Sequence, residues 1–155
     1  MQEWLKRWDL QSELMELVID ANILIAAFIK KSTTRELLLY RTPKPIKLYT
    51  PPFILEELSQ HTPLLSSKTG ISEKEIMGLV LELLYTSNIE IINDKELTEV
   101  KRVAEKIAPD KNDSAYFAVA LYKNCEIWSN DRPLKKQNRI IVITTKELLA
   151  ILGNI

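Results

Sequence analysis

The chain has 155 residues, of which 46% are hydrophobic and 27% are charged, and its 21 basic residues balance its 21 acidic ones. This length suits one domain that buries a core without staples, and the zero net charge excludes recruitment of nucleic acid by an overall positive field, although a local basic patch can still bind it. The single cysteine, Cys125, excludes an intramolecular disulfide and a multi-cysteine zinc site, and its apolar neighbours favour a buried, inert thiol.

Strand-like and helix-like patterns alternate along the chain. Residues 2–15 carry tryptophans and leucines among charges, which predicts an amphipathic helix, so we expect residues 1–16 to form an N-terminal helical extension. Short apolar runs predict strands over residues 17–20, 47–50, 89–92, 127–129 and 140–143. Helical spacing and start signals predict helices from Ser32 to Leu39, after Pro51 and Pro52, from Ser72 to Leu84, from Glu96 to Ala108, from Asp113 to Tyr122 and from Thr144 to Leu152.

This alternation predicts one α/β domain over residues 1–155, with a parallel sheet covered on both faces. The longest apolar run, Ile23 to Ile29, is too short to cross a bilayer. The first residues lack the basic-then-apolar order of a signal peptide. We therefore expect a cytoplasmic protein with no membrane segment.

Four acidic residues stand where predicted strands end or predicted helices begin: Asp20, Glu57, Asp113 and Asp131. Each has an ordinary explanation. Asp20 can cap the next helix, and Asp131 can belong to a turn. Glu57 and Asp113 fall in the first turns of helices, where the helix dipole favours an acid.

Taken together, the positions of these four acids indicate a shared site, which no single acid indicates. Right-handed crossovers can bring all four to one edge of the sheet, the edge at which open α/β sheets bind ligands. Clustered carboxylates repel one another unless they are protonated or neutralised by a cation. Oxygen-only ligands suit Mg²⁺ or Mn²⁺ rather than zinc, and such a site can activate a water for attack on a phosphate.

Four blocks of this sequence resemble, in order, the motifs of PIN-domain nucleases. They are Val18 to Leu24, Thr50 to Leu58, Asp110 to Leu121 and Trp128 to Leu134. The resemblance covers about residues 17 to 145. It implies a three-layer α/β/α sandwich around a parallel sheet and an endoribonuclease that depends on Mg²⁺ or Mn²⁺.

By position in these blocks, the resemblance implies that Asp20, Glu57, Asp113 and Asp131 are the catalytic metal ligands. Asn22, Ser129 and Asp110 are then supporting residues. Glu56 replaces Glu57 if the helix register slips by one residue, but the leucine that follows favours Glu57.

Basic residues cluster immediately after Asp131, at Arg132, Lys135, Lys136 and Arg139. One interpretation is a rim that contacts RNA phosphates, with Lys30 and Lys31 across the cleft. The alternative is a solvated loop. The only histidine, His61, is expected at the surface, and one histidine argues against a metal-free ribonuclease built on paired imidazoles.

The resemblance implies an RNA substrate and an antitoxin as a candidate partner. The extension with Trp4 and Trp8 either packs on the core or forms a surface for a homodimer or a partner. Many toxins of the VapC type begin almost at their first strand, whereas sixteen residues precede Leu17 here, which weakens the toxin assignment. A haloacid-dehalogenase-type phosphotransferase needs a second Asp where this chain has Asn22. A non-catalytic PIN-like module that binds RNA or serves assembly is the remaining alternative, and the complete set of four acids disfavours it.

Overall fold

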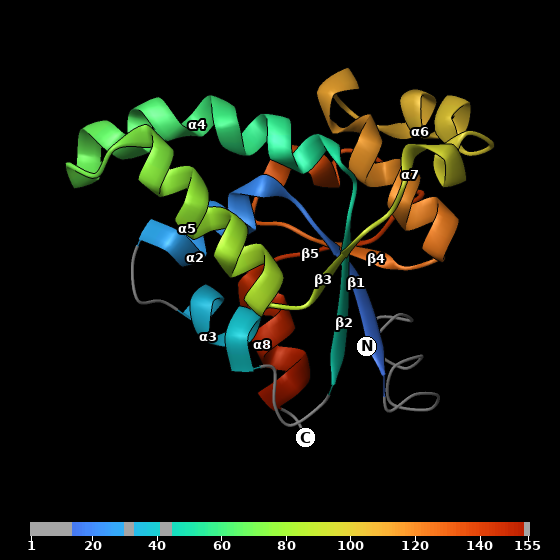
Figure 1. Cartoon of the computed structure of the whole chain (residues 1–155). Coiled ribbons are helices and arrows are strands. Elements are labelled where there is room, and N and C mark those ends of the chain that lie inside the picture. Colours follow the sequence, from blue (N-terminus) through green and yellow to red (C-terminus); the bar gives the residue numbers. More distant parts are fainter. Residues whose placement is uncertain (1–13, 30–32, 41–44, 154–155) are drawn as a thin grey trace.

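The computed structural model of the chain describes residues 14–29, 33–40 and 45–153 (Figure 1). Lys30, Lys31 and most of the expected N-terminal helical extension lie outside these residues. The strands are β1 (Met15–Ile19), β2 (Ile46–Thr50), β3 (Ile89–Ile91), β4 (Glu126–Trp128) and β5 (Val142–Ile143). The helices are α2 (Ala21–Ile29), α3 (Thr33–Tyr40), α4 (Phe53–Thr69), α5 (Glu73–Thr86), α6 (Lys101–Ile107), α7 (Ser114–Lys123) and α8 (Thr145–Gly153).

The strands form one parallel sheet in the order β3-β2-β1-β4-β5, which confirms the expected parallel sheet. The chain moves outward from β1 to β3 and then returns to place β4 on the other side of β1. The direction of winding therefore reverses between β1 and β4, and ligands of open α/β sheets bind at such a point, beside the carboxyl ends of the strands. The register pairs Ile19 with Trp128, so the residues that follow them, Asp20 and Ser129, leave the sheet side by side.

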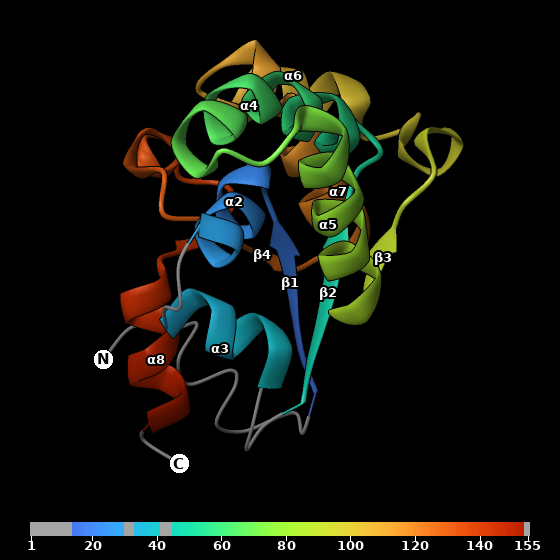
Figure 2. The same cartoon turned by 60° about the vertical axis from the view of Figure 1, so that its left-hand side comes forward.

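The helices cover both faces of the sheet, which confirms the α/β/α sandwich. The crossovers from β1 to β2 and from β2 to β3 are right-handed and place α2, α3 and α5 on one face of the sheet. The connection from β3 to β4 places α6 and α7 on the other face. Figures 1 and 2 show this division, with α8 on the same face as α3. A hydrogen bond of 3.2 Å between the hydroxyls of Thr34 and Thr145 joins the first turns of α3 and α8. In the described part of the chain, no helix is long and apolar enough to span a membrane.

The central strands are buried on both faces, as their unbroken apolar sequences predict. Leu17, Val18 and Ile19 of β1 are fully buried, and so is Trp128 of β4, which confirms it as strand core. The thiol of Cys125 is buried, as expected. Burial of this continuous apolar surface is the main force that holds the polar strand ends in place.

The structure differs from the predicted elements at several of their ends, among them the start of β1 and the start of the expected helix over residues 96–108. β1 begins at Met15 rather than Leu17, so the expected N-terminal extension overlaps the strand by two residues. The expected helix over residues 96–108 is wrong at its start, because a 3₁₀ helix (Asp94–Leu97) and a turn precede α6. There the side chain of Asn93 accepts a hydrogen bond from the backbone N–H of Lys95 at 3.0 Å, and such side-chain bonds compete with an α-helix.

α4 begins after the two prolines, as expected, passes through Pro63 and continues to Thr69, an end that the sequence pattern left open. A proline removes one helical hydrogen bond, in this case the bond to the carbonyl of Ser59. The hydroxyl of Thr62 donates to that carbonyl at 2.8 Å and satisfies it. The helix therefore survives the proline and ends at Gly70, whose φ of 75° is the left-handed conformation of a helix C-cap.

Candidate active site

Asp20 is the most buried acid of the candidate site, with 5% of its surface exposed at the end of β1. Its Oδ1 accepts a hydrogen bond from the backbone N–H of Ile23 at 3.2 Å, so it does cap α2. Burial is the largest cause that raises the pKa of Asp20 to about 7; the charges of Glu57 and Asp131 act in the same direction, and the hydrogen bonds from Ser129 and Ile23 act against it. An acid used only as a cap has no need of this burial.

Ser129 connects the ends of the two strands at the switch point. Its side chain is fully buried, and its hydroxyl donates to Oδ2 of Asp20 in a short hydrogen bond. The hydroxyl oxygen of Ser129 in turn accepts a hydrogen bond from the backbone N–H of Asp131 at 3.0 Å. The serine therefore fixes the orientation of Asp20 and the direction in which the chain leaves β4 toward Asp131.

Glu57 projects from the first turns of α4 and is held from α7. The hydroxyl of Tyr116 donates to Oε1 of Glu57 in a short hydrogen bond, and the tyrosine is 99% buried (1% exposed). Burial and the bond to Glu57 raise the pKa of Tyr116 above that of an ordinary tyrosine, so it stays a donor. The ring of Phe53 meets the tyrosine ring edge-on, with centroids 6.3 Å apart. By contrast, Glu56 is exposed, which supports the expected helix register.

Asp113 and Asp131 complete the acidic group. Asp113 is half-buried where α7 begins, and burial raises its pKa to about 6, with further contributions from the charges of Asp131, Asp110 and Glu57. Asp131 is half-buried in the loop after β4. Since Glu57 and Asp131 each raise the pKa of both Asp20 and Asp113, the four carboxylates share one region of negative potential.

The donor set fits a hard divalent cation, because carboxylate oxygens are the ligands that Mg²⁺ and Mn²⁺ prefer. Among the residues that the structure describes, however, no three His, Cys, Asp or Glu side chains form a group that could hold one ion as they stand. Mutual repulsion accounts for such an open arrangement, and Glu57 is also held by its tyrosine partner. A bound cation would therefore need the carboxylates to turn toward it.

The predicted supporting residues lie at different places. Ser129 contacts Asp20, whereas Asn22 is exposed in the first turn of α2. Asp110 is exposed and caps the 3₁₀ helix Lys111–Asp113, where it accepts a hydrogen bond from the N–H of Asn112 at 3.0 Å. The negative charge of Asp110 contributes to the raised pKa of Asp113.

The predicted basic rim is exposed directly after the site, in the 3₁₀ helix Arg132–Lys135 and at Lys136. One of its members is already engaged, because Nζ of Lys135 lies 2.6 Å from Oε1 of Glu147 in α8. Hydrogen bonds from Lys135 and Thr144 lower the pKa of Glu147 against the effect of its partial burial. Arg132 and Lys136 make no ion pair with any other described residue.

Sequence reasoning missed two side chains of this edge. Tyr116 stands in an apolar helix pattern, and its only signal is its position one helical turn after Asp113. Thr50 ends β2, is fully buried and donates to the backbone carbonyl of Ile19 at 3.1 Å. A polar residue at the end of a buried strand was the available signal for Thr50.

Comparisons with known proteins agree with this architecture. The family model for the PIN domain matches residues 18–148, so the chain belongs to the PIN domain family. A search of curated proteins finds no match.

Three solved structures share the fold at low sequence identity. The protein PAE2754 from Pyrobaculum aerophilum superposes with a TM-score of 0.62 at 17% identity, covering 91% of each chain. A toxin–antitoxin complex from Klebsiella pneumoniae gives 0.56 at 17% identity, covering 83% of this chain and 97% of that one. VapBC2 from Rickettsia felis, bound to a DNA fragment from its promoter, gives 0.56 at 18% identity, covering 84% and 98%.

Proposed function

We propose that this protein is an endoribonuclease that hydrolyses RNA phosphodiester bonds with Mg²⁺ or Mn²⁺ held by Asp20, Glu57, Asp113 and Asp131. The observation that carries the proposal is the burial of Asp20 at the switch point of the sheet, within the field of the other carboxylates. Burial of a carboxylate beside other carboxylates costs free energy, and an acid in contact with solvent does not have this cost. Acids with raised pKa values at the edge where open α/β sheets bind ligands are characteristic of functional sites.

The chain's own residues have separable tasks in this proposal. Ser129 orients Asp20, and Tyr116 orients Glu57. Arg132 and Lys136 lie where they can contact RNA phosphates beside the acids. The chemistry that a divalent cation held by the four carboxylates would supply is a more acidic water as nucleophile and balance of the charge on the phosphate.

Two of the solved structures with this fold are toxin–antitoxin assemblies, which supports an antitoxin protein as a candidate partner. An RNA-cleaving toxin acts where its substrate is, so the cytoplasm is the proposed compartment. A homodimer, a single domain over the whole chain and a role for the N-terminal extension stay predictions.

The alternative is a PIN-like module that binds RNA without cutting it. The open arrangement of the four carboxylates is the observation that favours it. The two functions differ in one measurable property, which is metal-dependent loss of the intact RNA.

The test is cleavage of an end-labelled RNA with single-stranded loops, in Mn²⁺, in Mg²⁺ and in EDTA. We expect cleavage with metal only, and a loss of at least about 100-fold in Asp20→Asn and Glu57→Gln. Glu105→Gln is the control, because it removes an exposed acid of α6 that belongs neither to the acidic site nor to the cavity beside it, and it should retain most of the activity. RNA that stays intact in both metals would favour the non-catalytic module.

A further inference from the structure

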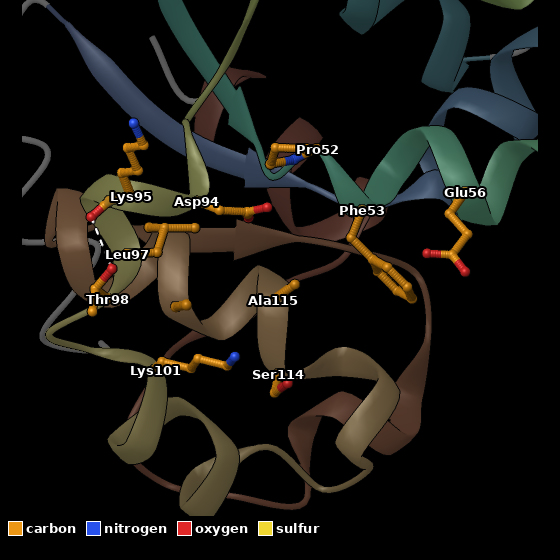
Figure 3. A pocket seen from close by; sticks show the side chains of 11 residues that line it. Pro52, Phe53, Glu56, Asp94, Lys95, Leu97, Thr98, Lys101, Ser114 and Ala115 are labelled. Carbon is orange, nitrogen blue, oxygen red and sulfur yellow. Dashed lines mark hydrogen bonds between the residues drawn. The ribbon is translucent and has the colours of Figure 1, made fainter.

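We propose that a cavity beside the carboxylates binds one nucleotide of the RNA, an inference that rests on the proposed function. The cavity measures about 690 Å³ and lies between the start of α4, the 3₁₀ helix Asp94–Leu97, α6 and α7 (Figure 3). Its volume falls within the range of about 300–1,000 Å³ that small-molecule sites occupy. None of the four site carboxylates lines it.

The cavity and the acidic site share a wall. Glu56 and Ser114 line the cavity, and each is the chain neighbour of a site carboxylate. Phe53 also lines it, and its ring packs edge-on against Tyr116, which holds Glu57. A nucleotide whose phosphate lies at the carboxylates therefore has its base or its neighbour's base within reach of the cavity.

The apolar lining suits a nucleobase. Pro52, Phe53 and Leu97 form one part of the lining, and the small side chains of Ala115 and Ala118 in α7 leave the space open. Single-stranded RNA is held mainly by unstacked bases that lie against aromatic and apolar side chains. The binding energy of such contacts does not require a particular base.

The polar lining suits the rest of the nucleotide. Lys101 extends from α6 toward Ser114 and Ala115, as Figure 3 shows. Within the described residues Lys101 makes no ion pair, so its ammonium can contact a phosphate. The carboxylate of Asp94 points toward the cavity and can accept from an amino group of the base, whereas Lys95 points away from it. A nucleotide carries an anionic phosphate and a flat base. The cavity offers the ammonium of Lys101 to the first and an apolar surface to the second.

The experiment titrates the ¹⁵N-labelled full chain with the four nucleoside 5′-monophosphates in EDTA, followed by NMR. We expect saturable shifts of the amides around Phe53, Leu97, Lys101 and Ala115. Lys101→Gln should weaken binding about 10-fold through loss of a phosphate contact. Lys106→Gln is the matched control, because it removes an exposed charge from the same helix outside the cavity, and it should bind as the wild type does.

A second variant, Ala115→Leu, fills the cavity without changing its charge, and it should abolish the shifts in a protein whose spectrum is otherwise native. Shifts that survive both Ala115→Leu and Lys101→Gln, or the absence of shifts in a protein that cuts RNA, would overturn the nucleotide site and leave the nuclease standing. Binding at the cavity in a protein that cuts no RNA in either metal would support the nucleotide site and overturn the proposed hydrolysis.

Discussion

The hydroxyl of Ser129 donates to the carboxylate of Asp20 and thereby joins the carboxyl ends of β4 and β1. The two residues are 109 positions apart in the chain, yet they follow a directly paired register position of the sheet. Because both partners of this hydrogen bond are buried, the core rather than a loop determines the orientation of the Asp20 carboxylate.

Ser129→Ala should raise the pKa of Asp20, because the lost hydrogen bond stabilises the charged form. It should weaken Mn²⁺ binding by roughly 10- to 100-fold, the usual effect of losing a residue that orients a ligand. The free energy of unfolding should fall by about 1–3 kcal/mol, because a buried acceptor loses its donor. Calorimetric titration with Mn²⁺ and urea denaturation measure the two effects. The control is Ser87→Ala, which removes another fully buried serine hydroxyl and should leave Mn²⁺ affinity unchanged.

Tyr116→Phe should lower Mn²⁺ affinity by about 10-fold or more while the melting temperature changes little. The phenylalanine keeps the edge-on contact with Phe53 but removes the donor to Glu57. Tyr122→Phe, an exposed substitution on the same helix, is the control for the lost hydroxyl. Unchanged affinity in Tyr116→Phe would show that the tyrosine has only a packing role.

The stability of the metal-free protein should fall as the pH rises from about 4 to about 7. Burial raises the pKa of Asp20 to about 7 and that of Asp113 to about 6, above their value of 3.8 as free side chains. The folded state therefore holds protons that the unfolded state releases, and the stabilisation present below pH 4 is lost as the pH rises through the folded values. Each pKa unit is about 1.4 kcal/mol, so Asp20 alone contributes a few kcal/mol.

Urea denaturation in EDTA at pH 5 and pH 8 measures this dependence. Asp20→Asn should show a smaller fall between the two pH values, because its amide does not titrate and can still cap α2. Equal falls in the variant and the wild type would mean that Asp20 titrates normally.

RNA affinity should depend more on Lys136 than on Lys135. Lys135 is paired with Glu147 at 2.6 Å, so an RNA phosphate must compete for it. Lys136→Ala should reduce the affinity for RNA. It should also make the slope of log affinity against log salt shallower by about the amount that one phosphate contact contributes. Fluorescence anisotropy with Asp20→Asn as the parent protein measures binding without cleavage. A larger loss in Lys135→Ala than in Lys136→Ala would contradict the assignment.

The sequence predicted the parallel sheet because its strands are short apolar runs separated by helical patterns. Chain order and crossover handedness restrict where strand ends can lie, and they led to the prediction that Asp20 and the other three acids share one edge of the sheet. Ser129 was assigned only by the resemblance to PIN-domain nucleases. The sequence did not predict the bond of Tyr116 to Glu57, which depends on the packing angle between α4 and α7. The pairing of Lys135 with Glu147 was hidden for the same reason, because it depends on how α8 returns to the sheet.

One local error also has a physical cause. The apolar period of residues 96–108 is consistent with one helix, but the side chains of Asn93 and Thr98 make hydrogen bonds to the backbone of Lys95 that break it. The sequence left the end of α4 open, and the continuation of this helix past Pro63 depends on the adjacent Thr62.

The most direct test of the metal site is a titration of the ¹⁵N-labelled protein with Mn²⁺, followed by paramagnetic broadening of backbone amides. We expect the amides of Ile23, Glu57, Ser114 and Asp131 to broaden first and together, at substoichiometric Mn²⁺, and we expect Asp20→Asn to remove this effect. Broadening that begins elsewhere, or that is unchanged in Asp20→Asn, would contradict a metal centre at the carboxyl edge of the sheet.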